Sequence, residues 1–347
     1  MDNNDKFKIV IYGIGAIGAS LGGWLSPHYD EIYLLARGEN AKIMKSRGLI
    51  IYQRGDNNKI SIPVKVIENL NEKPSADVIV IAVKNYDLEE VAKDIFSKLG
   101  DKPIIVAFQN GVENQKILPN YFTKVIYGVI AFNAWRDKPG IFGYRRNGEI
   151  ILGTIDNSLQ SIMEKLSQIL NFGISTKITK RLQDAAHSKM IINIGNSILT
   201  LIDFNYDKML NEISSISKLR KILINMLNEG IQIIQSAGYK EYKLKGIPSW
   251  KILKIMRDTP DDKADELFKQ SMKEYGVNSM MQDIIIRGKS QSELESLNGY
   301  FVKLADSLNI KAPFIKTVYQ LCKTQFNKST FQPLNIDVVW NKINENL

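Results

Sequence analysis

Cysteine and histidine are scarce in this chain of 347 residues, which holds only Cys322, His28 and His187. A single cysteine cannot form an internal disulfide, and so few thiols are typical of a reducing compartment. No Cys, His and Asp residues have the spacing of metal ligands, so we expect no metal. No apolar run approaches the roughly 18 residues that span a bilayer, and the polar start lacks a signal-peptide pattern. We therefore expect a cytoplasmic protein without a membrane partner.

Long runs of one charge are also missing, although the net charge is +9. The lysines are scattered among acidic residues, and no aromatic residues are interleaved with a basic stretch. This pattern is typical of a solvated surface, so we expect no nucleic-acid partner, while the positive charge is compatible with small anionic ligands. With 44% hydrophobic and 24% charged residues, the composition is that of a globular protein long enough for two domains.

The first half of the chain alternates short apolar runs with helical segments. The predicted strands are 7–13, 31–37, 77–84, 103–109, 124–132 and 150–154, and the predicted helices are 16–26 and 87–99. Strand–helix alternation predicts a mostly parallel sheet with helices on both faces. The later strands, joined by the turn-rich residues 133–150, are compatible with an antiparallel extension of that sheet.

The second half reads as helical. The predicted helices are 184–204, 211–237, 262–275, 278–288 and 291–308. We therefore predict an α/β fold, with a Rossmann-type dinucleotide-binding domain over residues 1–182 and an all-helical substrate domain over residues 183–347.

A glycine-rich turn joins the first predicted strand to the first predicted helix, in the pattern Gly13-x-Gly15-x-x-Gly18. In a strand–turn–helix setting this pattern predicts a dinucleotide site. The first glycine permits the tight turn, the second lets the backbone approach a pyrophosphate, and the third lets helix and strand pack closely. The expected cofactor-binding residues here are Gly13, Ile14, Gly15, Ala16, Ile17 and Gly18. A tight turn without a ligand is the alternative.

Three further residues lie at the ends of predicted strands, where ligands of open α/β sheets bind. Arg37 follows the second strand, at the position where NAD-binding proteins usually carry an acidic residue. A guanidinium suits the 2′-phosphate of NADP, so we predict NADP(H), although Glu39 lies nearby. Lys84 is the last residue of the strand 77–84, and Asn110 follows the strand 103–109. Simple turn chemistry is the alternative for Asn110, because Asn-Gly favours turns.

A polar stripe crosses the otherwise apolar helix that begins near residue 184. Lys189, Asn193, Asn196 and Thr200 are spaced at i, i+4, i+7 and i+11, which places them on one helix face. Two interpretations remain open from this stretch alone. It is either a half-exposed helix with a polar edge, or a helix that lines a polar site in which Lys189 is a functional residue.

Together these segments resemble the ketopantoate reductase (2-dehydropantoate 2-reductase) family over nearly the whole chain. The resemblance is based on the glycine turn, on VKNYDLEEV and QNGVEN, on the lysine–asparagine helix, and on the stretch that runs from NSMMQD to SLNGY. It implies NADPH-dependent reduction of ketopantoate, a 2-oxo acid, to pantoate for pantothenate and coenzyme A synthesis. It also makes a homodimer through the helical domain plausible.

The resemblance assigns roles to individual residues. Lys189 matches the catalytic lysine, which stabilises the developing oxyanion and donates a proton. Glu293 matches a glutamate near substrate and lysine, although Ser290-x-x-Glu293 also fits a capping box. Lys84 and Asn110 match residues at the nicotinamide end. The expected substrate-binding residues are Asn193, Asn196, Ser197, Ser279 and Asn110.

This chain departs from the family pattern on the substrate side. His187 stands where an aromatic residue is common, Ser197 stands where a second asparagine is expected, and residues 239–260 are unusual. These departures leave three alternatives to ketopantoate reduction. The chain is then a reductase of another 2-oxo acid, an NADP-binding sensor without catalysis, or an opine-type dehydrogenase that uses His187 and Asp184.

Overall fold

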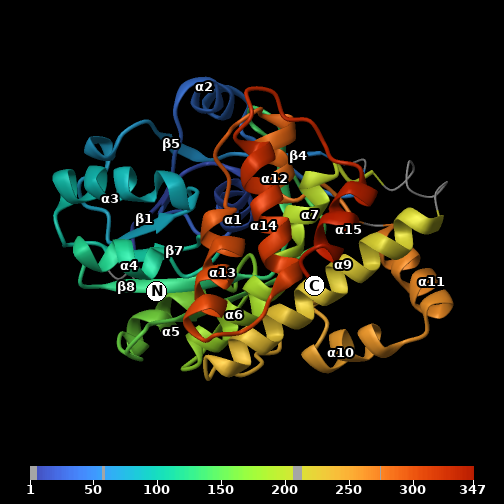
Figure 1. Ribbon diagram of the computed structural model, residues 1–347. Helices are drawn as coiled ribbons and strands as arrows, with labels where there is room; N and C mark the ends of the chain where they lie inside the picture. The colour runs from blue at the N-terminus through green and yellow to red at the C-terminus, as the bar shows by residue number, and fades with distance from the viewer. Residues whose placement is uncertain (1–5, 57–58, 206–212, 274) are drawn as a thin grey trace. The chain divides into compact units, whose positions relative to one another are not determined.

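The computed structural model describes residues 6–56, 59–205, 213–273 and 275–347 (Figure 1). The chain divides into two compact units. Unit 1 comprises Met1–Ala186 with Leu244–Gly246, and unit 2 comprises His187–Lys243 with Ile247–Leu347. In the described part of the chain, no helix combines the length and the apolar character needed to cross a membrane.

Unit 1 contains an eight-stranded sheet with the order β12-β11-β8-β7-β6-β1-β2-β5. Its strands are β1 (Ile9–Tyr12), β2 (Ile32–Leu35), β5 (Lys65–Ile67), β6 (Val78–Ile81), β7 (Ile104–Ala107), β8 (Val125–Ile130), β11 (Glu149–Gly153) and β12 (Ser175–Ile178). The six strands from β5 to β8 are parallel. Counted along the chain, these six have the spatial order 3-2-1-4-5-6 of a Rossmann-type sheet, which confirms the predicted fold class.

Helices cover both faces of this sheet, which explains why its central strands are apolar at every position. All four residues of β1, β6 and β7 are buried. The helices of unit 1 are α1 (Ala16–Leu25), α2 (Gly38–Arg47), α3 (Asn85–Leu99), α4 (Asn114–Ile117) and α5 (Gln160–Leu170), and α6 (Leu182–Asn193) begins there. β11 pairs antiparallel with β8, as the antiparallel extension required.

A second, four-stranded sheet with the order β4-β3-β10-β9 packs against α1. Its strands are β3 (Leu49–Gln53), β4 (Ile60–Ile62), β9 (Ala134–Lys138) and β10 (Ile141–Tyr144). The turn-rich residues 133–150 thus contain two strands, β9 and β10, that the sequence analysis did not predict. β9 is mostly polar and exposed, and β10 pairs with β3 across about ninety residues of sequence, so local patterns give little signal.

Glycines allow α1 to lie between the two sheets. A Cβ on Gly22 would lie 2.8 Å from Leu34 of the large sheet, and a Cβ on Gly23 would lie 2.7 Å from Ile51 of the small sheet. Every residue of α1 from Gly18 to Leu25 is buried. The helix that carries the glycine turn is thus held from both sides.

The regular elements in the described residues of unit 2 are all helices, as predicted. Its helices are the end of α6, α7 (Gly195–Leu201), α9 (Ile213–Ser236), α10 (Trp250–Asp258), α11 (Asp261–Met272), α12 (Ser279–Met281), α13 (Tyr300–Ser307), α14 (Pro313–Phe326) and α15 (Ile336–Asn344). π-Helical turns at Gln282–Ile286 and Glu295–Gly299 continue α12 and precede α13. Of the predicted helical positions, 211, 212 and 274 lie outside the described residues.

The long helix α9 packs against α10, α11, α13, α14 and α15. Two charged side chains of α9 hold their neighbours. Arg220, which is 3% exposed, pairs with Asp261 and Asp265 of α11. The Glu229 carboxylate accepts hydrogen bonds from the N–H groups of Phe314 and Ile315 at the start of α14, at 3.0 and 2.8 Å. The polar groups of α9 therefore fix the helices around it.

Candidate active site

The glycine turn of unit 1 has the geometry that a dinucleotide site requires. Gly13 has φ +99, and a Cβ there would lie 2.6 Å from Val83 Cγ1. A Cβ on Gly18 would lie 2.2 Å from the carbonyl oxygen of Gly13, so helix and turn can approach only without a side chain. Beside Gly15 there is open space. α1 begins at Ala16 without a side-chain cap, so its first N–H groups are available to an anion such as a pyrophosphate.

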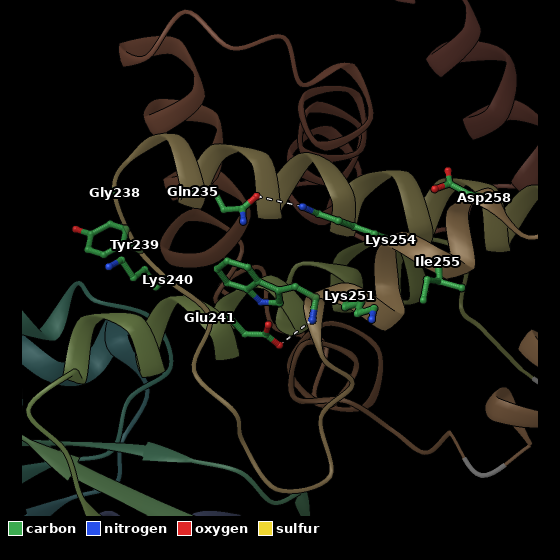
Figure 2. Close-up of a pocket in the computed structure, with 10 residues that line it drawn as sticks. Gln235, Gly238, Tyr239, Lys240, Glu241, Lys251, Lys254, Ile255 and Asp258 are labelled. Atoms are coloured by element: carbon green, nitrogen blue, oxygen red, sulfur yellow. Dashed lines mark hydrogen bonds between the residues drawn. The ribbon is translucent and has the colours of Figure 1, made fainter.

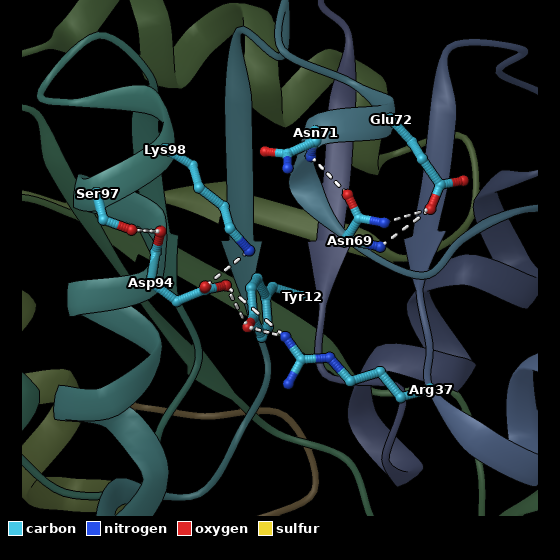
Figure 3. A network of polar contacts seen from close by, with 8 residues as sticks. All are labelled: Tyr12, Arg37, Asn69, Asn71, Glu72, Asp94, Ser97 and Lys98. Atoms are coloured by element: carbon cyan, nitrogen blue, oxygen red, sulfur yellow. Dashed lines mark hydrogen bonds and ion pairs between the residues drawn. The ribbon is translucent and has the colours of Figure 1, made fainter.

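Arg37 lies between the end of β2 and the start of α2, where the sequence predicts a contact with a 2′-phosphate. Its Nη2 donates to the hydroxyl of Tyr12 at 2.9 Å, and Tyr12 in turn donates to Asp94 at 2.8 Å (Figure 3). The Arg37 side chain is 60% exposed. The sequence analysis did not identify Tyr12 and Asp94 as partners of Arg37. The Tyr12 hydroxyl, at the end of an apolar strand, was a signal in the sequence, because such a hydroxyl needs a hydrogen-bond partner.

Lys84 and Asn110 lie in unit 1 after β6 and β7, and hydrogen bonds tie these two strand ends together. The Gln109 amide donates to the carbonyl of Ile81 at 2.8 Å, and the Asn85 amide donates to the carbonyl of Asn110 at 2.6 Å. Val83 lies against Gly13. The structure therefore brings Lys84 and Asn110 to the same edge of the sheet as the glycine turn.

In unit 2, the predicted helix 184–204 is bent at Ile194, between α6 and α7. The carbonyl of Ile194 accepts hydrogen bonds from Ser197 Oγ at 2.8 Å and from Asn298 Nδ2 at 3.2 Å. Asn298 Nδ2 also donates to Ser197 Oγ at 2.9 Å, and both residues are 0% exposed. This contradicts the expectation that Ser197 contacts substrate, because its hydroxyl is buried and holds the bend.

The bend also divides the polar stripe. Lys189 and Asn196 are half-buried, whereas Asn193 is 8% exposed and Thr200 is fully buried. Asn196 Oδ1 accepts a hydrogen bond from the Tyr275 hydroxyl at 3.0 Å. The accessible residues of the polar stripe are therefore Lys189 and Asn196.

Two predicted residues that are distant in sequence meet beside α7. Ser279 Oγ donates to Glu293 Oε2 at 3.1 Å, and Glu293 is 3% exposed. Asn278 caps α12 and contacts Thr200 Oγ1 at 3.4 Å and the carbonyl of Asn196 at 3.5 Å, which ties this pair to α7. The capping-box alternative for Glu293 is wrong, because the next helical turn begins at Glu295 and no helix begins at Ser290.

Lys189 has an unusual electrostatic environment. Among the described residues its Nζ has neither a hydrogen-bond partner nor an ion-pair partner, so Glu293 does not neutralise it. Burial lowers the pKa of Lys189 from 10.5 to about 8. At pH 7 the ammonium form then outnumbers the amine by roughly ten to one. Such a group is charged at neutral pH and is also a good proton donor.

His187 is packed between two tyrosines and is 1% exposed. Its ring stacks on Tyr239 with centroids 3.8 Å apart, and its Nε2 lies 2.7 Å from the hydroxyl of Tyr300. Asp184, the other residue of the opine-type alternative, accepts a hydrogen bond from Arg181 at 2.7 Å. The His187 ring is therefore held in an aromatic environment.

The unusual segment 239–260 forms part of an open pocket of about 680 Å³ between the end of α9 and α10 (Figure 2). Figure 2 shows Lys254 reaching Gln235, at 3.3 Å, and the Glu241 carboxylate accepts from the N–H of Trp250 at 2.8 Å. None of the site residues predicted from the sequence lines this pocket. Within the described residues, no group of three or more His, Cys, Asp or Glu side chains is placed to hold a metal ion.

Two family models match the chain. Ketopantoate reductase PanE/ApbA matches residues 9–157, and Ketopantoate reductase PanE/ApbA C terminal matches residues 181–325. A 2-dehydropantoate 2-reductase of Pyrococcus abyssi is 28% identical over 320 residues, which cover 91% of this chain and 97% of that protein.

Solved structures share the fold at lower identity. D-mandelate dehydrogenase, in a ternary structure with NADH and anilino(oxo)acetate, has a TM-score of 0.72 at 17% identity over 97% of this chain and 99% of its own. A dimeric ketopantoate reductase from Staphylococcus aureus has a TM-score of 0.67 at 18% identity, over 91% of this chain and 97% of its own. The two family matches together span most of the chain, including the glycine turn and the lysine helix, and the chain belongs to the ketopantoate reductase family.

Proposed function

We propose that this protein is an NADPH-dependent oxidoreductase that reduces 2-dehydropantoate to pantoate. The observation that carries the proposal is Lys189, a half-buried ammonium without a partner among the described residues, whose pKa is lowered to about 8. Reduction of a keto carbon leaves negative charge on oxygen, and a positioned ammonium stabilises that charge and donates the proton. Family membership and the relatives named 2-dehydropantoate 2-reductase support this substrate.

The residues of unit 1 fit the cofactor. The open space beside Gly15 and the uncapped N-terminus of α1 suit a pyrophosphate, and Arg37 suits a 2′-phosphate. Lys84 and Asn110 lie at the strand ends where the nicotinamide half is expected. When bound, the cofactor supplies the hydride.

The residues of unit 2 fit a hydroxylated 2-oxo acid. Asn193 lies on α6 with Lys189, and Asn196 lies on α7. The Ser279 hydroxyl donates a hydrogen bond to Glu293, so it is already committed. We propose that a substrate hydroxyl replaces Ser279 as the donor to Glu293, which frees Ser279 to donate to the substrate carboxylate. The product pantoate then serves pantothenate and coenzyme A synthesis in the cytoplasm, and a homodimer is proposed because the Staphylococcus aureus relative is dimeric.

A second candidate is the reduction of a different 2-oxo acid. His187 is two residues before Lys189, and Ser197 stands next to Asn196 in place of an asparagine, so the packing beside these two residues departs from the family pattern, which favours this candidate. The shared fold with D-mandelate dehydrogenase makes an aromatic 2-oxo acid the natural comparison substrate, and that protein's NADH makes NADH the comparison cofactor.

The test is NADPH and NADH oxidation by the purified full chain with 2-dehydropantoate, pyruvate and benzoylformate. Lys189→Met keeps the length of the side chain and removes its charge, and is expected to lower kcat roughly 10²- to 10⁴-fold. Lys303→Met, at an exposed position of the same unit, is the matched control. Preference for another 2-oxo acid would favour the second candidate. Cofactor binding without turnover of any substrate would contradict both and favour the sensor alternative.

A further inference from the structure

Arg37 is joined to an acidic side chain of another element. Arg37 immediately precedes α2, Tyr12 ends β1 and Asp94 lies within α3, so three elements meet here (Figure 3). The Tyr12 hydroxyl accepts from Arg37 Nη2 at 2.9 Å and donates to Asp94 Oδ2 at 2.8 Å. The same Nη2 lies 3.7 Å from Asp94 Oδ2. One carboxylate oxygen therefore faces the guanidinium that we propose for a 2′-phosphate.

The other oxygen of Asp94 is bound to a different cation. Lys98, one turn further along α3, lies 2.8 Å from Asp94 Oδ1. Asp94 and Lys98 are each 26% exposed, whereas Arg37 is 60% exposed. Arg37 is thus the most exposed member of the network and the one farthest from the carboxylate.

The carboxylate is ionised at neutral pH. Partial burial alone would raise the pKa of Asp94, but hydrogen bonds from Lys98 and Tyr12, with the charges of Lys98 and Arg37, hold it below its ordinary value. Tyr12 stays a neutral bridge, because burial and the neighbouring Asp94 raise its pKa. Arg37 therefore faces a full negative charge before any cofactor arrives.

We propose that Asp94 is a specificity-determining residue that competes with the 2′-phosphate of NADPH for Arg37, and that Lys98 sets the strength of this competition. The inference rests on the proposed function, because it takes NADPH as the cofactor. When Arg37 turns to the phosphate, Asp94 keeps Lys98 and Tyr12, so no partly buried charge is left alone. NADH carries a neutral hydroxyl at the same position, which does not attract the Arg37 guanidinium away from Asp94. The network thus lowers the preference for NADPH below what Arg37 alone would give.

The test is direct titration of the full chain with NADPH and with NADH, followed by cofactor fluorescence, which needs no turnover. Asp94→Asn is expected to lower the NADPH Kd roughly two- to fivefold, the strength of an exposed ion pair, with the NADH Kd unchanged. Lys98→Gln is expected to raise the NADPH Kd by a similar factor, because Asp94 then holds Arg37 more strongly. Glu90→Gln is the matched control, since it removes a charge from the exposed side of α3.

The two variants have opposite expected signs, so a general loss of structure cannot imitate the result. In an Arg37→Gln background the effect of Asp94→Asn on NADPH should disappear. If Arg37→Gln lowers the NADPH preference but Asp94→Asn leaves it unchanged, the inference is wrong and the cofactor proposal stands. If Arg37→Gln itself leaves the ratio of the two Kd values unchanged, Arg37 does not contact the 2′-phosphate and both the inference and the proposed role of Arg37 are wrong. If wild type binds NADH more tightly than NADPH, the proposed use of NADPH is wrong as well.

Discussion

Lys189 is the residue at which catalysis and stability are expected to conflict most clearly. Burial lowers its pKa from 10.5 to about 8, which means that the charged form costs more free energy in the folded protein than in the unfolded chain. At about 1.4 kcal/mol for each pKa unit, this lowering corresponds to about 3 kcal/mol. Lys189→Met removes the charge and fills nearly the same volume. We therefore expect the variant to lose activity while its free energy of unfolding at pH 7 rises by up to about 3 kcal/mol.

The pH dependence gives this prediction a sign that can be checked. Between about pH 8 and 10.5 the unfolded chain holds one more proton at Lys189 than the folded chain does. The stability contributed by this residue therefore rises with pH across that window. Methionine does not titrate, so the advantage of the variant should be largest below pH 8 and should shrink towards pH 10.5.

The assay is urea unfolding of wild type and Lys189→Met, followed by circular dichroism at pH 7.0 and pH 9.5. Lys303→Met, at an exposed position, should change the free energy of unfolding by less than about 0.5 kcal/mol at both pH values. Destabilisation by Lys189→Met of more than about 1 kcal/mol at pH 7 would refute the reasoning. It would mean that the ammonium has a stabilising partner in the folded protein.

Three further predictions concern activity and packing. With saturating cofactor, kcat/KM for reduction should fall about tenfold for each pH unit above about 8, because the proton donor Lys189 is lost there; a flat profile to pH 9.5 would contradict this role. Gly18→Ala should have a lower melting temperature than wild type, because its Cβ would overlap the carbonyl oxygen of Gly13. Gly15→Ala should keep the wild-type melting temperature, because open space surrounds its Cβ, and should raise the cofactor Kd at least tenfold in titrations. Asn298→Ala should lower the free energy of unfolding by about 1–3 kcal/mol and reduce kcat. Ser197→Ala should leave the substrate KM unchanged in steady-state assays, because its hydroxyl is buried. A large rise in KM would mean that Ser197 does contact the substrate.

The parts of the fold that the sequence predicted are those with a local signal. β1, β6 and β7 are short apolar runs, and such runs are typical of strands covered on both faces. The second sheet has no such signal, because it depends on pairing between β3 and β10, which are distant in sequence. The polar strand β9 lies at the edge of this sheet, where it pairs with β10. Pairing between strands that are distant in the chain leaves little local pattern, so it is hard to predict from a single sequence.

The candidate site shows the same division. The resemblance to a family predicted Ser279 and Glu293 as neighbours of one substrate, and the structure joins their side chains at 3.1 Å. It gave no indication of Asn298 at the bend, 104 residues from Ile194, or of Asp94, 82 residues from Tyr12. These are buried or half-buried polar groups whose partners lie on other elements. Their need for a partner can be read from the sequence, but the identity of the partner cannot.

The bend at Ile194 and the two π-helical turns follow from one physical requirement. Ser279 precedes the first π turn and Glu293 precedes the second. Asn298, within the second turn, donates to the carbonyl freed at the Ile194 bend. A straight α-helix satisfies its own carbonyls and turns its side chains by a fixed angle, so it offers no spare acceptor here. At Ile194 the carbonyl instead accepts a hydrogen bond from Asn298 of another segment. π-Helical turns such as the one that carries Asn298 are often found at functional sites. Asn278 therefore joins α7 to the segment that carries Ser279, and Asn298 joins it to the segment that follows Glu293. A loss of Asn298 should affect Lys189 through the bend rather than through any direct contact.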